Sequence, residues 1–166
     1  MNVQEATTRR LPDLKERHLP ENCRETINTI LKETYGYEQF RNLEIYDDLS
    51  KGKEKLCISQ GQLIENVILE AEKAWKGETQ VDNILLTAPT GSGKSLLFQL
   101  PAIYLGKEYN LLTIVVSPLK ALIVDQVESL QELGYTRVAY ASSDLSPEQK
   151  MEVYRQVREG AVSYTH

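Results

Sequence analysis

APTGSGKS, at residues 88–95, is the stretch that decides the fold of this 166-residue chain. It follows an apolar run at 83–87 and precedes a run of leucines that begins at Leu96, so the order is strand, loop, helix. Gly91 and Gly93 allow the backbone amides to curl around negative oxygens, and the start of the helix adds the positive end of its dipole. This combination predicts a loop that binds phosphate groups.

The side chains of the loop supply what a magnesium-bound nucleoside triphosphate needs. Lys94 can reach the β and γ phosphate oxygens, and Ser95 is placed to ligate Mg²⁺ held by ATP. We therefore predict ATP and Mg²⁺ as cofactors, with catalytic roles for these two residues. The other cofactor-binding residues of the loop are Thr90, Gly91, Ser92 and Gly93. A glycine-rich turn that binds nothing is the alternative, and the GKS triplet between strand and helix argues against it.

The strand and helix pattern repeats after the loop. LLTIVVS at 111–117 predicts a second strand, 119–133 a helix that ends at Gly134, and 137–141 a third strand. Strands that alternate with helices form a parallel sheet with helices packed on it. The predicted fold class is therefore α/β, a P-loop NTPase (RecA-like) parallel sheet flanked by helices, incomplete, with a helical N-terminal extension.

The helical extension is predicted from residues spaced three and four apart. Ile27, Ile30, Leu31 and Tyr35 form one stripe of a helix that Gly36 can close.

Two further helices have clear ends. One runs from Gln62 to about Gly77, with a buried face expected from Ile64, Val67, Ile68, Ala71 and Trp75. The other starts at Ser146, with Pro147 in its first position and Gln149 completing a capping box.

Composition indicates a globular protein without a membrane span. Apolar residues make up 41% and charged residues 26%, and no apolar run approaches the roughly 20 residues that a spanning helix requires. We expect a cytoplasmic protein with no membrane partner.

The net charge of −5 argues against a surface that is basic throughout but allows a local nucleic-acid groove. Cys23 and Cys57 fit no metal-ligand spacing and are expected to be plain thiols.

Three blocks resemble the RecQ-like branch of superfamily-two (DEAD/DEAH-type) ATP-dependent helicases. They are LKETYGYEQFR at 31–41, the loop with its helix at 88–102, and VVSPLKALIVDQVESLQELG at 115–134. Ala88 replaces the glycine that starts the general phosphate-loop pattern, and this variant resembles helicases more than small GTPases or nucleoside kinases. The resemblance implies an ATP-driven motor on single-stranded or duplex nucleic acid, and the block at 115–134 favours DNA.

The same resemblance implies a nucleic-acid surface. Ser117, Pro118, Leu119 and Lys120 follow the second strand and are expected to line a strand-binding groove. The alternative is a tight turn with Lys120 as a solvated charge. Ser142, after the third strand, is at a position where related motors contact backbone phosphate.

The family reads adenine with a glutamine shortly after a Phe-Arg pair, and this sequence departs from that spacing. After Phe40 and Arg41 the next Gly-Gln pair is Gly61 and Gln62. Either an insertion follows Arg41, or ISQGQ at 58–62 alone matches the family segment. Both interpretations assign the adenine role to Gln62, because a carboxamide can both donate to and accept from the base.

Other assignments at this site stay open. Gln39 and Gln60 are rivals for the adenine role, and a glutamine that faces water at a helix start is a further alternative. Tyr37 and Arg41 are expected to contribute to the cofactor site, in a manner that depends on which glutamine is used.

Composition, periodicity and the resemblance together suggest four segments. They are a flexible arm at 1–20, a helical lead-in at 21–77 with a suspected insertion at about 42–57, the first part of RecA-like helicase domain 1 at 78–161, and a tail at 162–166. The tail, VSYTH, resembles a translated sequencing-adapter sequence, and we interpret it as non-native.

Hydrolysis in this family uses a D-E-x-H box and a second motor domain, which the 166 residues do not contain. Asp47, Asp48 and Asp144 are not credible substitutes. We therefore expect a truncated ATP-binding portion of a helicase. The alternatives are a nucleotide-binding regulatory module, or a motor subunit of a restriction-type system without autonomous unwinding.

Overall fold

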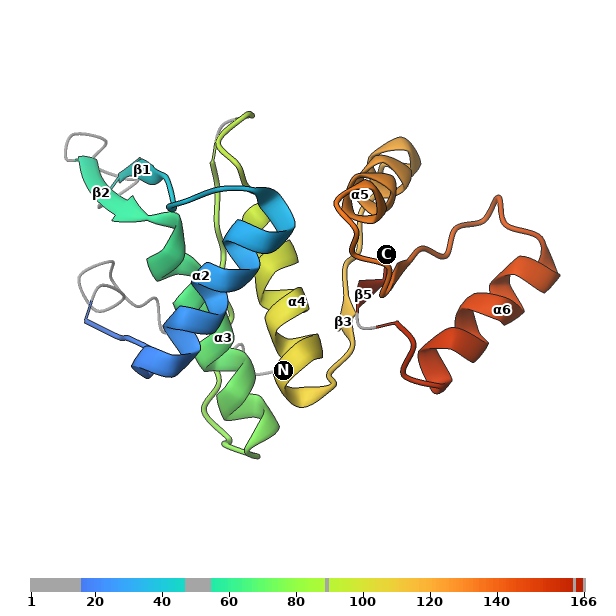
Figure 1. Ribbon diagram of the computed structural model, residues 1–166, viewed down its shortest axis with the longest axis horizontal. Coiled ribbons are helices and arrows are strands. Elements are labelled where there is room, and N and C mark those ends of the chain that lie inside the picture. The colour runs from blue at the N-terminus through green and yellow to red at the C-terminus, as the bar shows by residue number, and fades with distance from the viewer. Residues whose placement is uncertain (1–15, 47–54, 89, 163, 166) are drawn as a thin grey trace, which may run out of the picture. The chain divides into compact units, whose positions relative to one another are not determined.

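The structure, a computed structural model, describes residues 16–46, 55–88, 90–162 and 164–165 (Figure 1). Its helices are α2 (Glu21–Tyr35), α3 (Gln60–Trp75), α4 (Leu96–Tyr109), α5 (Lys120–Glu132) and α6 (Pro147–Arg158), and its strands are β1 (Asn42–Tyr46), β2 (Lys55–Ser59), β3 (Thr113–Ile114), β4 (Val138–Ala139) and β5 (Tyr164–Thr165). The chain forms two compact units. The first holds the described residues up to Glu25 and Gln39–Phe98, and the second holds Thr26–Glu38 and the described residues from Gln99.

A β-hairpin precedes α3 in the first unit. Strands β1 and β2 pair antiparallel, with Asn42 opposite Ser59 and Leu43 opposite Ile58. Ile58 is 1% exposed, and β2 passes directly into α3 (Figure 1). In the region at about 42–57, predicted as an insertion, the described residues are therefore paired strands, and residues 47–54 lie outside the described residues.

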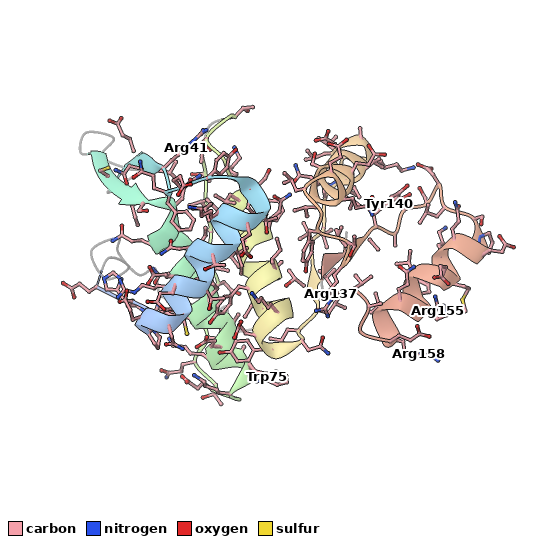
Figure 2. All side chains as sticks on the ribbon, viewed as in Figure 1. Arg41, Trp75, Arg137, Tyr140, Arg155 and Arg158 are labelled. Carbon is pink, nitrogen blue, oxygen red and sulfur yellow. The ribbon has the colours of Figure 1, made fainter. Side chains whose placement is uncertain are left out.

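Helix α3 confirms the predicted helix and corrects part of its buried face. Ile64 and Ile68 are fully buried, and Gly77 follows the helix with a φ of +78°. Trp75, however, is 58% exposed, and Figure 2 labels it at the end of the helix. The prediction for Trp75 was wrong because it is the last helical residue. Periodicity gives the direction of a side chain but not how far along the helix the neighbouring surface extends.

Charged groups hold the segment before α2 against α3. Leu19 is 2% exposed, and its backbone amide donates a hydrogen bond to Glu65 (3.0 Å). Arg17 donates to the carboxylate of Glu70 (2.6 Å). Residues 16–20 of the predicted arm are thus docked on α3, and residues 1–15 lie outside the described residues.

The strand predicted at 83–87 does not form. Ile84 is 46% exposed and Leu85 is 92% exposed. In the described part of the first unit the two strands, β1 and β2, pair with each other. A β-strand requires hydrogen bonds from a neighbouring strand, so an apolar sequence alone does not produce one.

Three short parallel strands form the sheet of the second unit, in the order β3-β5-β4. Strands β3 and β4 lie within the predicted strands at 111–117 and 137–141, but each spans two residues. Strand β5 pairs with both of them and falls within the tail interpreted as non-native. The extended parallel sheet of a complete P-loop NTPase stays a prediction.

Helix α4 leads from the phosphate loop into the second unit. Every residue from Gln99 to Gly106 is buried, so this helix is surrounded by protein rather than amphipathic. At its end, Asn110 has a φ of +52° and its side chain accepts a hydrogen bond from Arg137 (2.8 Å), labelled in Figure 2. Arg137 also donates to the carbonyl of Gly160 after α6 (2.9 Å). One guanidinium therefore ties the ends of two helices to the start of β4.

The predicted ends of α2, α5 and α6 are confirmed. Gly36 and Gly134 have positive φ values of 69° and 85° directly after their helices. Ser146 and Gln149 form the predicted capping box, in which each side chain accepts a hydrogen bond from the other residue's backbone amide (2.8 and 3.2 Å). In the described residues, no helix has the length and apolar content to cross a membrane.

Replacing Ser146 with alanine should loosen α6. Because this helix has no buried residue, it depends on its cap and on surface pairs. Loss of the cap costs about 1 kcal/mol, which corresponds to roughly fivefold faster amide exchange in α6. Hydrogen–deuterium exchange checks this, with Ser129→Ala on α5 as the control. Unchanged exchange in α6 would show that the cap does not hold the helix.

Candidate functional site

The phosphate loop turns sharply into the start of α4. Gly91 and Gly93 both have a φ of +80°, a conformation that side chains other than glycine rarely adopt. The helix then begins with short-range bonds, because the amides of Leu96 and Leu97 donate to the carbonyls of Gly93 (3.2 Å) and Lys94 (3.0 Å). Both predicted glycines therefore adopt the left-handed backbone that allows the chain to turn tightly before the helix.

The side chains of the loop fit a polyphosphate bound with a cation. A Cβ added to Gly91 would meet nothing within 4 Å, so that side of the loop is open. The hydroxyl of Ser92 is buried, and no described group hydrogen-bonds to it. Such a hydroxyl costs free energy, and a phosphate oxygen would supply its missing acceptor. Ser95 is half-buried at the helix start, and Thr90 is exposed.

The Lys94 side chain bridges the two ends of the loop in this structure. Its ammonium donates to the backbone carbonyl of Ala88 (2.5 Å), at the other end of the loop. Binding of a phosphate by Lys94 requires this bond to be exchanged for one to the ligand. A lysine can make that exchange because its ammonium is a compact charge on a flexible stem.

The structure separates the roles of the two glutamines at the start of α3. Gln62 accepts a hydrogen bond from the amide of Ser59 (3.1 Å) and forms the capping box of the helix. Gln60 is 2% exposed and reaches the phosphate loop, where its amide group donates to the carbonyls of Ser92 and Gly93 (3.4 Å each). The sequence placed Gln62 first and Gln60 among its rivals. Gln39 is exposed.

Tyr37 and Arg41 occupy different surroundings. Tyr37 belongs to the second unit, is 48% exposed and stacks on Tyr35, with ring centroids 6.4 Å apart. Arg41, labelled in Figure 2, belongs to the first unit and is exposed. Its backbone is fixed by Gln60, which donates to the Arg41 carbonyl (2.9 Å) and accepts from the Arg41 amide (3.2 Å).

The predicted nucleic-acid residues of the second unit lie close together. The Lys120 ammonium forms an ion pair with the Asp144 carboxylate (2.7 Å), and the Asp144 amide donates to the hydroxyl of Ser142 (3.3 Å). The Lys120 hydrogen bond is the main cause that lowers the pKa of Asp144, so this carboxylate is charged at neutral pH. Two loops far apart in the sequence are thereby joined at one surface.

Ser117, Pro118 and Leu119 complete this surface. The Ser117 hydroxyl accepts from the Leu119 amide (3.3 Å), which shapes the turn into α5. Pro118 is exposed, and Leu119 is 63% exposed. The surface therefore combines hydroxyls, one ion pair and an exposed apolar side chain, and hydroxyls and lysines are among the groups that contact nucleic-acid phosphates in proteins.

A glycine-rich loop at a helix start, followed by a strand and a second helix, is the arrangement typical of P-loop proteins. The sequence profile of DEAD/DEAH box helicases matches residues 60–165. The chain belongs to this family.

Curated relatives are RecQ-like. The chain is 32% identical over 132 residues to the ATP-dependent DNA helicase RecQ of Synechocystis sp., a match that covers 80% of this chain and 21% of that protein. It is 31% identical over 138 residues to ATP-dependent DNA helicase Q-like 5 of Arabidopsis thaliana, covering 83% of this chain and 12% of that protein. It is also 41% identical over 78 residues to ATP-dependent DNA helicase Q4 of Mus musculus, covering 47% of this chain and 6% of that protein. The chain thus spans about a fifth or less of the length of these relatives.

Proposed function

We propose that this chain provides the ATP-binding part of a RecQ-like, ATP-dependent DNA helicase motor. The observation that carries the proposal is the loop at 90–95, in which two left-handed glycines lead into a buried helix beside Lys94 and Ser95. The family match and the relatives, which are named as ATP-dependent DNA helicases, support the same function.

Each residue of the loop has a defined part in this proposal. The glycines present backbone amides to the phosphates, Lys94 balances their charge, and Ser95 holds the accompanying Mg²⁺. Bound ATP would supply the free energy for movement along a strand through its hydrolysis. Gln62 remains a candidate for recognition of the base.

The second part of the proposal is that the surface around Lys120 contacts DNA. Lys120 can bind a backbone phosphate, and the hydroxyls of Ser117 and Ser142 are suitable donors to phosphate oxygens. Asp144 now occupies the Lys120 ammonium, so the ion pair must open for a phosphate to bind. This competition predicts opposite effects for the two charged residues.

Lys120→Ala should weaken binding of a single-stranded oligonucleotide, and Asp144→Asn should strengthen it. Solvent screens these exposed charges, so each change should be small, roughly two- to fivefold, and loss of a phosphate contact should lower the slope of log affinity against log salt concentration by about one. Fluorescence anisotropy at several salt concentrations measures both effects.

The control for Asp144→Asn is Asp125→Asn, which removes the same charge five residues along α5 from Lys120 and hence on another face of the helix. Equal gains from both aspartates would indicate a general effect of net charge. In that case the DNA surface would not be at Lys120.

A further inference from the structure

Gln60 is a buried polar side chain that hydrogen-bonds to two backbone segments of the first unit. It is the first residue of α3 and is 2% exposed. Its oxygen accepts from the amide of Arg41 (3.2 Å), and its nitrogen donates to the carbonyls of Ser92 and Gly93 (3.4 Å each). A buried carboxamide with both ends used in this way has a structural task within the protein.

The contacts around Gln60 are close. A Cβ added to Gly93 would lie 2.6 Å from the nitrogen of Gln60, so the glycine and the carboxamide fit against each other. On the next residue, a Cβ added to Gly61 would lie 2.7 Å from the ring of Phe40. The start of α3 is therefore packed against the Phe-Arg segment on one side and against the phosphate loop on the other.

We propose that Gln60 is a positioning residue that holds the phosphate loop in its binding conformation and links it to the Phe40–Arg41 segment. This inference rests on the proposed function of the loop as an ATP site. It assigns Gln60 a role different from recognition of adenine, because both ends of its carboxamide are already bonded to backbone groups.

Only a side chain of this length with both a donor and an acceptor can make these contacts. Glutamate keeps the acceptor for the Arg41 amide but has no donor for the two carbonyls, and its charge would repel them. Alanine removes both interactions and leaves the Arg41 amide without its partner. Gln60→Glu and Gln60→Ala therefore test the same link in two ways.

Binding of three probes separates positioning from base recognition. Mg-ATP, Mg-GTP and magnesium tripolyphosphate are titrated by calorimetry into the wild-type chain and into both Gln60 variants. A positioning role predicts a loss of about tenfold for all three probes, because they share only the phosphates. A loss confined to Mg-ATP would overturn the proposal in favour of adenine recognition. Gln131→Ala, which truncates an exposed glutamine on α5, is the matched control and should leave the binding of all three probes unchanged.

Hydrogen–deuterium exchange without nucleotide tests the link independently. Gln60→Glu should speed exchange of the amides at 90–95 by fivefold or more while leaving those at 64–72 of α3 unchanged. Unchanged exchange at 90–95 would refute the inference. If the wild-type chain binds none of the probes, the proposed ATP site fails, and the exchange result still decides whether Gln60 holds the loop.

Discussion

Replacing Lys94 with alanine is expected to lower the affinity for Mg-ATP by about 30- to 150-fold. A charge-assisted bond between an ammonium and a phosphate contributes about 2–3 kcal/mol, and each 1.4 kcal/mol is a factor of ten in affinity. The wild type must break the bond from Lys94 to Ala88 when a phosphate binds, but this bond to a neutral carbonyl is weaker than a bond to a charged phosphate and offsets only part of the loss. The measurement is a titration of a fluorescent ATP analogue in the presence of Mg²⁺.

Lys107→Ala is the matched control for this experiment. Lys107 is exposed and lies in the last turn of α4, the helix that the phosphate loop begins. It has the same charge but is distant from the loop along the helix, so its loss should leave binding unchanged. If Lys94→Ala bound the analogue as tightly as the wild type, or if both variants weakened it equally, the loop would not be the nucleotide site.

Glu70→Gln is expected to lower the free energy of unfolding by about 1–3 kcal/mol at neutral pH. Glu70 is 4% exposed, and its carboxylate accepts from Arg17 (2.6 Å), the Asp82 amide (2.9 Å) and Lys73 (3.1 Å). Asp82 precedes the segment that enters the phosphate loop, so the same carboxylate also fixes the start of that segment. Arg17 and Lys73 are partly exposed, which keeps the expected loss below that of a fully buried ion pair.

The pH dependence of this loss follows from the pKa of Glu70. Burial by itself would raise the pKa, but the hydrogen bonds from the Asp82 amide, Arg17 and Lys73 outweigh it and lower the pKa from 4.5 to about 2. Because the folded state has the lower pKa, the stabilisation is complete above about pH 4.5 and is lost as the pH falls towards 2. The difference in stability between wild type and Glu70→Gln should therefore shrink across that window in urea denaturation series.

Glu152→Gln is the control for Glu70→Gln. Hydrogen bonds from Arg155 and Gln156 also lower the pKa of Glu152 to about 2, but this carboxylate lies on the exposed helix α6. Solvent screens such a pair, so its loss should change global stability far less than the loss of Glu70. Equal losses in the two variants would mean that burial of Glu70 adds nothing.

Sequence reasoning predicted the helices well because their signals are local. The spacing of Ile27, Ile30 and Leu31 lies within one helix, and the capping box of Ser146 involves residues three apart. Gly91 and Gly93 were likewise identified from their own short motif, and both have the left-handed backbone that it requires. Interactions that span only a few residues do not depend on the rest of the fold.

The hairpin β1–β2 is an intermediate case. Leu43 alternates with polar residues before residues 47–54, and Ile58 belongs to a similar alternation after them. Such alternation is typical of paired strands. The charged run at 51–55 obscured that pattern, and only the pairing of Asn42 with Ser59 establishes the hairpin. Period-two alternation over five residues is a weak signal when the turn is not a recognisable short one.

The sequence by itself thus determined the phosphate loop, the helices and their ends, and the family that these motifs indicate. Tertiary structure decided that 83–87 forms no strand, that Trp75 is exposed, and that Gln60 rather than Gln62 reaches the loop. The physical reason is the same in each case. A strand, a buried surface and a long-range hydrogen bond all need a partner from a distant part of the chain, and neither composition nor spacing specifies where that partner lies.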